Sequence, residues 1–164
     1  MIYILGIDPG AHGGYCFKFL DGTDNKAFAF NKQTPAEIVK TIENYIDTMR
    51  FINGIESITA FIEEVHTMPH DGKVSAFSFG KNYGWWLGVL TSLKIPIIEI
   101  PPAKWQAGLK LRVRGLEYRD KKKALKEAAQ KRFPDLNLTL DTCDAALIAE
   151  YGRQIILAER MAAK

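Results

Sequence analysis

The sequence predicts an α/β protein with a five-stranded mixed sheet flanked by helices, in which three strands pair antiparallel and two more join in parallel. Three short strand-like segments near the amino terminus are connected by turn sequences, which favours antiparallel pairing. The two later strand-like segments each follow a stretch with helical periodicity, which favours crossover connections. Of the 164 residues, 47% are apolar, so we expect a single domain over residues 1–164 with one sizeable core.

Turn residues and charges bound the expected strands. The first strand ends at Asp8 before Pro-Gly, and the second alternates apolar and polar side chains up to the turn Asp21-Gly22. The fourth is apolar and β-branched until Glu63 and Glu64 interrupt it. We expect strands over residues 2–8, 14–20, 27–31, 57–65 and 95–100.

Capping signals and apolar periodicity predict the helices. Thr34, Pro35 and Glu37 have the spacing of an N-cap, a first-turn proline and a capping-box acid. Apolar side chains at helical spacing follow, through Met49. Further helices are expected over residues 74–93, 120–133 and 140–161, with a basic loop over residues 110–119.

Composition excludes several classes of protein. No stretch approaches the roughly 18 uninterrupted apolar residues of a membrane span. The apolar start of the chain has no basic segment before it, so we expect no signal peptide. Cys16 and Cys143 form no Cys-x-x-Cys pair, which excludes a disulfide scaffold and a cysteine-built zinc site. The expected setting is the reducing cytoplasm, without membrane contact.

The net charge of +3 conceals a strongly basic segment. Residues 103–133 carry eleven Lys or Arg against three acids, whereas the rest of the chain carries eleven against sixteen. A run of charge is often only a solvated helix face. Basic residues this concentrated are also typical of a protein that binds phosphate backbones, and we favour a nucleic-acid partner over the solvated face.

Carboxylates end or begin three apolar segments. Asp8 and Glu63 each end an apolar strand, and Asp141 and Asp144 open the last expected helix at a spacing that places them on one face. Each acid alone has a structural interpretation, Asp8 as the cap of a turn and Asp141 as a helix N-cap. Together they predict a cluster of hard oxygen ligands for two Mg²⁺ or Mn²⁺ ions about 4 Å apart, which is typical of a nuclease.

Other catalytic motifs are absent from the sequence. It contains no phosphate-binding Gly-x-x-x-x-Gly-Lys loop, no Gly-x-Ser-x-Gly elbow and no His-Glu-x-x-His. His12 lies near Asp8 in sequence and is a possible accessory residue. His66 and His70 fit an exposed polar loop better than a metal site.

With these residues in hand, the chain resembles the RuvC-type Holliday junction resolvases of the ribonuclease H-like superfamily. The resemblance rests on ILGIDPG at 4–10, FIEEV at 61–65, the helix around 87–88, the lysine-rich stretch 120–126 and DTCDAALIA at 141–149. It implies a ribonuclease H-like fold and a crossover junction endodeoxyribonuclease. Such an enzyme cuts four-way (Holliday) and related branched DNA by paired symmetric nicks. The resemblance further implies a homodimer with two Mg²⁺ per active site, Mn²⁺ as a substitute, and no nucleotide cofactor.

The resemblance also implies roles for particular residues. The four catalytic and metal-binding acids correspond to Asp8, Glu63, Asp141 and Asp144, and Glu64 competes with Glu63 for its role. The catalytic lysine corresponds best to Lys122, with Lys121 and Lys123 as alternatives. The DNA-binding residues expected from the basic segment and the motif pattern are Lys104, Lys110, Arg112, Arg114, Arg119, Lys121, Lys123 and His66.

Some positions depart from the family pattern. His66 stands where the family often has an aromatic wedge, which leaves His66, Phe77 or Phe79 for that role. Gln106 replaces a family lysine, with Lys104 two residues earlier. The aromatic run at residues 83–87 is either a dimer surface or core filling.

Three other functions fit parts of the sequence. One is a structure-selective nuclease acting mainly on flaps, forks or hybrids, and another is a non-catalytic module that binds branched DNA. An ATP-binding fragment of the sugar-kinase and actin class also begins with a motif like Asp8-Pro9-Gly10. It needs a second subdomain and a second phosphate loop, for which this chain has no room.

Overall fold

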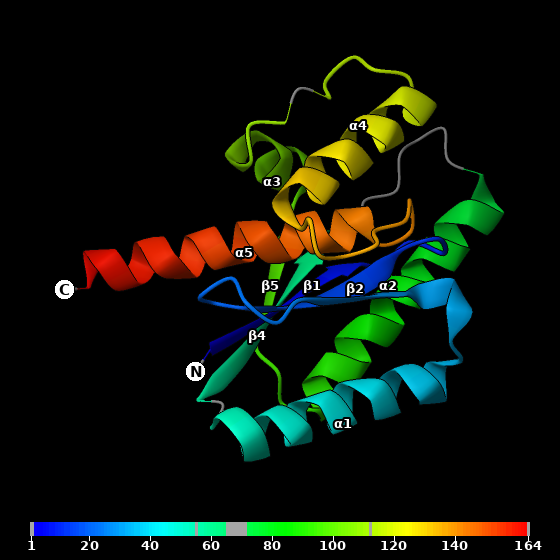
Figure 1. Cartoon of the computed structure of the whole chain (residues 1–164). Helices are drawn as coiled ribbons and strands as arrows, with labels where there is room; N and C mark the ends of the chain where they lie inside the picture. The colour runs from blue at the N-terminus through cyan, green and yellow to red at the C-terminus, as the bar shows by residue number, and fades with distance from the viewer. Residues whose placement is uncertain (1, 55, 65–71, 112, 164) are drawn as a thin grey trace.

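The structure is a computed structural model and describes residues 2–54, 56–64, 72–111 and 113–163. Within these residues five strands form one mixed sheet in the order β3-β2-β1-β4-β5 (Figure 1). β1 pairs antiparallel with β2 and parallel with β4, β2 pairs antiparallel with β3, and β4 pairs parallel with β5. The mixed sheet expected from the sequence is therefore confirmed. The strands are β1 (Ile2–Asp8), β2 (Gly14–Phe19), β3 (Lys26–Ala29), β4 (Ser57–Glu63) and β5 (Ile97–Ile100).

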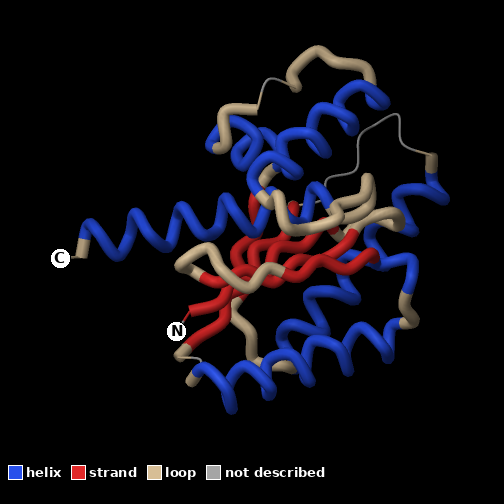
Figure 2. The backbone as a smooth tube through the Cα atoms, in the orientation of Figure 1, coloured by secondary structure: helices blue, strands red, loops and turns tan. Residues whose placement is uncertain are grey.

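Helices cover both faces of the sheet. α1 and α2 lie on one face, and α5 lies along the other with α3 and α4 outside it (Figure 1). In Figure 2 the strands form a layer between these two groups of helices. The sheet thus separates the apolar interior into two clusters, one on each face, where the composition had suggested one core. The helical segments are η1 (Phe30–Lys32), α1 (Pro35–Asn53), α2 (Lys73–Ser92), α3 (Pro102–Gly108), α4 (Tyr118–Arg132) and α5 (Cys143–Ala162).

The predicted capping box at the start of α1 is confirmed. Thr34 Oγ1 accepts a hydrogen bond from the Glu37 backbone N–H at 3.3 Å, and Glu37 Oε2 accepts one from the Thr34 backbone N–H at 2.7 Å. Two of the helix's free backbone donors are satisfied in this way. Pro35 occupies the first turn, where no N–H is needed.

α5 lies directly on the central strand because Gly6 has no side chain. A Cβ atom at Gly6 would lie 2.3 Å from the Ala145 carbonyl oxygen and 2.4 Å from the Ala149 backbone nitrogen. No larger residue fits there without moving the helix. This close approach brings the first turn of α5 over the carboxyl end of β1.

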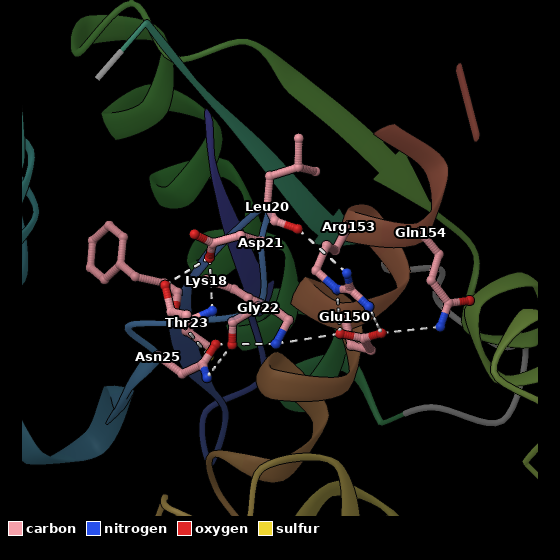
Figure 3. A network of polar contacts seen from close by, with 11 residues as sticks. Lys18, Leu20, Asp21, Gly22, Thr23, Asn25, Glu150, Arg153 and Gln154 are labelled. Atoms are coloured by element: carbon pink, nitrogen blue, oxygen red, sulfur yellow. Dashed lines mark hydrogen bonds and ion pairs between the residues drawn. The ribbon is translucent and has the colours of Figure 1, made fainter. Parts of the chain in front are cut away.

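A buried polar network fixes α5 along β2 (Figure 3). Lys18 Nζ lies 3.4 Å from Glu150 Oε2 and donates to Asn25 Oδ1 at 3.1 Å. Arg153 donates to both carboxylate oxygens of Glu150, from Nε at 2.9 Å and from Nη2 at 3.0 Å. Lys18 and Glu150 are both almost fully buried, so their pairing is what makes these charges tolerable inside the protein.

The structure corrects the predicted start of the last helix. α5 begins at Cys143, and Asp141 lies in the turn before it. Thr142 Oγ1 accepts from the Thr139 backbone N–H at 2.9 Å, and Thr139 Oγ1 accepts from the Asp141 backbone N–H at 3.3 Å. These local bonds hold the segment in a turn. The prediction that Asp141 and Asp144 share one face of a helical turn is therefore wrong.

Other boundaries differ less. α3 was not predicted, because Pro101-Pro102 was interpreted only as the end of a strand, whereas Pro102 stands in the first turn of a short helix. β3 ends at Ala29, before a 3₁₀ turn, and β5 begins at Ile97. None of the described helices combines the length and the apolar character that crossing a membrane requires.

Candidate active site

Two acids meet at the carboxyl ends of neighbouring strands. Asp8 ends β1 and Glu63 ends β4, and the preceding residues Ile7 and Ile62 are paired in the parallel ladder. Asp8 is only 7% exposed, and its Oδ1 accepts a hydrogen bond from the Gly10 backbone N–H at 3.0 Å. The strand register thus places two carboxylates side by side at the carboxyl ends of β1 and β4.

Lys122 of α4 and Asp144 of α5 lie at the same place. Lys122 Nζ is 2.5 Å from Asp144 Oδ2 and 3.9 Å from Asp8 Oδ2. Asp144 is 6% exposed, so its charge is held largely out of water. Four of the five predicted catalytic residues therefore come together from β1, β4, α4 and α5.

These four side chains line a cavity of about 350 Å³. Its wall also includes His12, Phe79, Gln106, Tyr118 and Lys121. The cavity thus contains acids on the sheet side and lysines on the α4 side. Of the alternatives left open by the sequence, Glu63 lines this cavity, whereas Glu64 is the residue whose charge acts on Tyr83 of α2.

Burial and mutual repulsion raise the pKa values of the two strand-end acids. The pKa of Asp8 is raised to about 6, first by burial and then by the Asp144 charge, while the Lys122 charge opposes the rise. The pKa of Glu63 is raised to about 8, first by burial and then by the Asp8 charge, while a hydrogen bond from Trp105 opposes the rise. For Lys122, burial lowers the pKa, but the charges of Asp144 and Asp8 outweigh burial and raise it. Lys122 is therefore protonated at neutral pH.

Asp141 lies apart from this cavity. It lines an adjacent hollow of about 440 Å³ together with His12, Lys122 and Lys123. Its Oδ2 accepts a hydrogen bond from Asn31 Nδ2 at 3.2 Å. The charge of Asp141 still contributes to the raised pKa of Asp8, as the smallest of the five causes.

The predicted DNA-binding residues fall into two groups. Arg119 and Lys123 line the adjacent hollow, and Lys121 lines the main cavity. Lys104, Lys110 and Arg114 are exposed on α3 and on the loop before α4. The other two predicted DNA-binding residues, Arg112 and His66, lie outside the described residues, as does the loop histidine His70.

The aromatic segment of α2 is divided between core and surface. Trp86 is fully buried against the sheet, and Tyr83, Trp85 and Leu87 are half-buried and pack against the same cluster. Core filling therefore accounts for much of this run. Of the alternative wedge residues, Phe77 is 74% exposed and Phe79 is 39% exposed at the wall of the main cavity.

Trp105 was missed by the sequence analysis. This residue of α3 is fully buried, and its Nε1–H donates to Glu63 Oε1 at 3.0 Å. The two residues are 42 positions apart in sequence, so local patterns did not reveal the contact. The one available signal in the sequence was a tryptophan shortly after β5, the strand that pairs with the strand of Glu63.

The donor set fits a hard divalent cation in chemistry and charge. Asp8, Glu63 and Asp144 offer carboxylate oxygens of the kind that Mg²⁺ and Mn²⁺ prefer. Burial and the charges of neighbouring acids raise the pKa values of Asp8 and Glu63, so a bound cation would favour their ionised forms. No group of three or more His, Cys, Asp or Glu side chains in the described residues is already arranged to hold an ion. The site thus has ligand atoms and charge that suit a divalent cation, but these atoms are not already arranged around a metal position.

Comparisons with known proteins bear on the fold. No protein-family model matches the sequence, and no curated protein matches it. A solved structure of T. thermophilus RuvC in complex with a Holliday junction substrate matches with a TM-score of 0.59 and 14% identity, over 94% of this chain and 96% of that chain. A second structure of Thermus thermophilus RuvC matches with a TM-score of 0.56 and 15% identity, over 95% and 96% of the two chains. This chain has the fold of RuvC. The resemblance inferred from the sequence motifs, and with it the ribonuclease H-like fold, is confirmed at the level of fold.

Proposed function

We propose that this protein is a metal-dependent endodeoxyribonuclease that resolves four-way DNA junctions and related branched DNA by paired symmetric nicks. The observation that carries the proposal is the convergence of Asp8, Glu63 and Asp144 with Lys122 in one cavity beside the basic helix α4. The fold shared with RuvC supports it, since one of the matching RuvC structures is a complex with a Holliday junction substrate.

Asp8, Glu63 and Asp144 would hold the divalent cations. Two Mg²⁺ ions, with Mn²⁺ as a substitute, would supply activation of the attacking water and stabilisation of the leaving oxygen of a phosphodiester. We retain Asp141 as the proposed fourth acid because its charge acts on Asp8. Together the carboxylates would attract these cations and hold them beside the carboxyl ends of β1 and β4.

Lys122 would bind the scissile phosphate. Its amine is protonated and partly buried, and it already lies beside two acids, so it is fixed where a phosphate oxygen would approach. A preorganised positive charge of this kind stabilises the charge that develops on phosphate in the transition state. Lys121, in the wall of the same cavity, would add a second contact.

The basic residues around the site would follow the DNA backbone. The adjacent hollow presents Arg119, Lys122 and Lys123, and it shares Lys122, Tyr118 and His12 with the main cavity. The two hollows share lining residues, and their lysines and arginine would contact successive phosphates of one strand. Contacts of this kind are independent of sequence, so selection of branched DNA would come from the geometry of the assembly.

A homodimer would supply two such sites for paired nicks. The outward side of α2 carries exposed Phe77 and three glycines spaced by four residues, Gly80, Gly84 and Gly88, with open space beyond each. An exposed aromatic side chain beside a row of glycines fits close packing of two copies about a two-fold axis.

The decisive experiment is cleavage of a panel of synthetic junction, fork, flap, hybrid and linear substrates in Mg²⁺. We expect symmetric nicks in the four-way junction and none with the Asp8→Asn variant, which should still bind the junction. Exposed Asp135→Asn is the matched control. Cleavage confined to flaps, forks or hybrids would assign the protein to another structure-selective nuclease class. Binding without cleavage by the unmodified protein would identify a non-catalytic module.

A further inference from the structure

We propose that Trp105 is a positioning residue of the active site: its indole N–H holds one oxygen of Glu63, so that the carboxylate presents its other oxygen to the bound cation. This inference rests on the proposed function. It concerns a residue of α3, the helix that the sequence patterns did not predict.

The contact is direct, and its donor is fully buried. Trp105 Nε1 donates to Glu63 Oε1 at 3.0 Å, and no part of Trp105 is exposed. The indole has one donor and no acceptor, so it can satisfy only one carboxylate oxygen. Rotation of the Glu63 carboxylate away from the indole would break this bond and leave a buried N–H unpaired, which is unfavourable.

α3 is itself fixed against the helix that carries Asp144. At the end of α3, a Cβ atom on Gly108 would lie 2.3 Å from Tyr151 Cε2 of α5. Trp105 belongs to the same buried cluster as the α5 residue Ala149. The indole is therefore held relative to α5, and through it Glu63 of β4 is held relative to Asp144.

The chemistry of the donor suits this role. An indole N–H carries no net charge, so it orients Glu63 without neutralising the carboxylate. Lys122 does the opposite for Asp144, because its ammonium group is itself a cation that pairs with the acid. Neutral hydrogen-bond donors that orient metal-binding carboxylates typically change metal affinity by about 10–100-fold when they are removed.

The test uses Mn²⁺ binding to the metal-free protein, measured by isothermal titration calorimetry. Trp105→Phe keeps an aromatic ring but removes the N–H, and we expect it to weaken Mn²⁺ binding by about 10-fold or more. Its cleavage activity should be restored at higher Mg²⁺ concentration. Trp86→Phe is the matched control, because Trp86 is equally buried and its Nε1 has no hydrogen-bond partner among the described residues. Unchanged affinity in Trp105→Phe, or equal loss in both variants, would overturn the proposal.

A measurement on the unmodified protein does not depend on the Trp105→Phe variant. The chain has three tryptophans, so ¹⁵N-labelled protein shows three indole N–H resonances, which Trp85→Phe and Trp86→Phe assign by elimination. We expect the Trp105 resonance to shift on addition of Mg²⁺ and the Trp86 resonance to stay in place. An unmoved Trp105 resonance in protein that binds Mg²⁺ would overturn the inference.

The two proposals can fail separately. Protein that cleaves four-way junctions but binds Mn²⁺ equally well after Trp105→Phe would retain the proposed function and refute the positioning role. Protein whose Mn²⁺ affinity depends on Trp105 but that cuts no junction would refute the substrate assignment and keep the positioning role.

Discussion

The amine of Lys122 lies 2.5 Å from Asp144 Oδ2 and thereby joins α4 to α5 at the carboxyl edge of the sheet. The same amine is 3.9 Å from Asp8 Oδ2, so one cation faces two buried acids. Glu63 lines the same cavity, where the Lys122 charge acts on it more weakly than the Asp8 charge does. Three carboxyl groups thus gather around the Lys122 amine, and a divalent cation would allow all three to ionise, which is the physical reason to expect one there.

Replacement of Lys122 by methionine should remove cleavage without removing metal binding. The methionine keeps an unbranched apolar side chain but has no charge for phosphate, so we expect single-turnover cleavage to fall by about 100-fold or more. Mn²⁺ affinity should be unchanged or tighter, because a competing cation is lost. Lys131→Met, at an exposed position on the same helix, is the control and should cleave normally. Normal cleavage by Lys122→Met would remove this residue from the mechanism.

The metal-free protein should become less stable as pH rises. The folded-state pKa values of Asp8 and Glu63 are raised to about 6 and about 8, so the folded protein retains protons that the unfolded chain has released. The stability contributed by these protonated acids is complete below about pH 4, the unfolded pKa range, and is lost as pH rises through the folded values. Urea unfolding in EDTA should therefore show lower stability at pH 8 than at pH 5.

Mg²⁺ should reverse that loss at pH 8, because a ligand that binds only the folded state stabilises it. Glu63→Gln should flatten the pH dependence in EDTA, since the neutral amide has no proton to lose. Stability that rises from pH 5 to pH 8 in EDTA would contradict the raised pKa values.

Gly6→Ala should both destabilise the protein and impair cleavage. The new Cβ would lie 2.3 Å from the Ala145 carbonyl oxygen, so α5 must move, and overpacking of this kind costs about 1–3 kcal/mol. Asp144 is adjacent to Ala145 and would be displaced with the helix. Gly72→Ala is the control, because nothing lies within 4 Å of its Cβ position and its φ of −62° suits any residue. Equal thermal stability and cleavage for both variants would show that β1 and α5 are not in close contact.

Reversal of charge in the adjacent hollow should weaken DNA binding. The double variant Arg119→Glu, Lys123→Glu removes two expected phosphate contacts. The slope of log affinity against log salt concentration should therefore become less steep by about two. Lys40→Glu on α1, on the opposite side of the sheet, serves as the control. An unchanged slope in fluorescence anisotropy titrations would place the DNA elsewhere.

The sequence predicted much of the sheet and of the site because local patterns were sufficient there. Asp8 and Glu63 each follow an apolar strand, so parallel pairing alone brings them together. Lys122 was identified only through the resemblance, and its contact with Asp144 agrees with that choice among three consecutive lysines.

Tertiary contacts and local side-chain bonds account for what was not predicted. The position of Asp141 depends on hydrogen bonds between Thr139 and Thr142, which compete with helix formation. α3 has seven residues, too few for a visible apolar period. The contact of Trp105 with Glu63 is a tertiary contact made by a helix that packs against α5.

The most direct test of the converging carboxylates is a crystal structure of the protein soaked in Mn²⁺, with the metal located by anomalous scattering. We predict anomalous density ligated by Asp8, Glu63 and Asp144, with Glu63 Oε1 still bonded to Trp105. Density absent from these oxygens, with Lys122 still the only cation beside Asp144, would contradict the account.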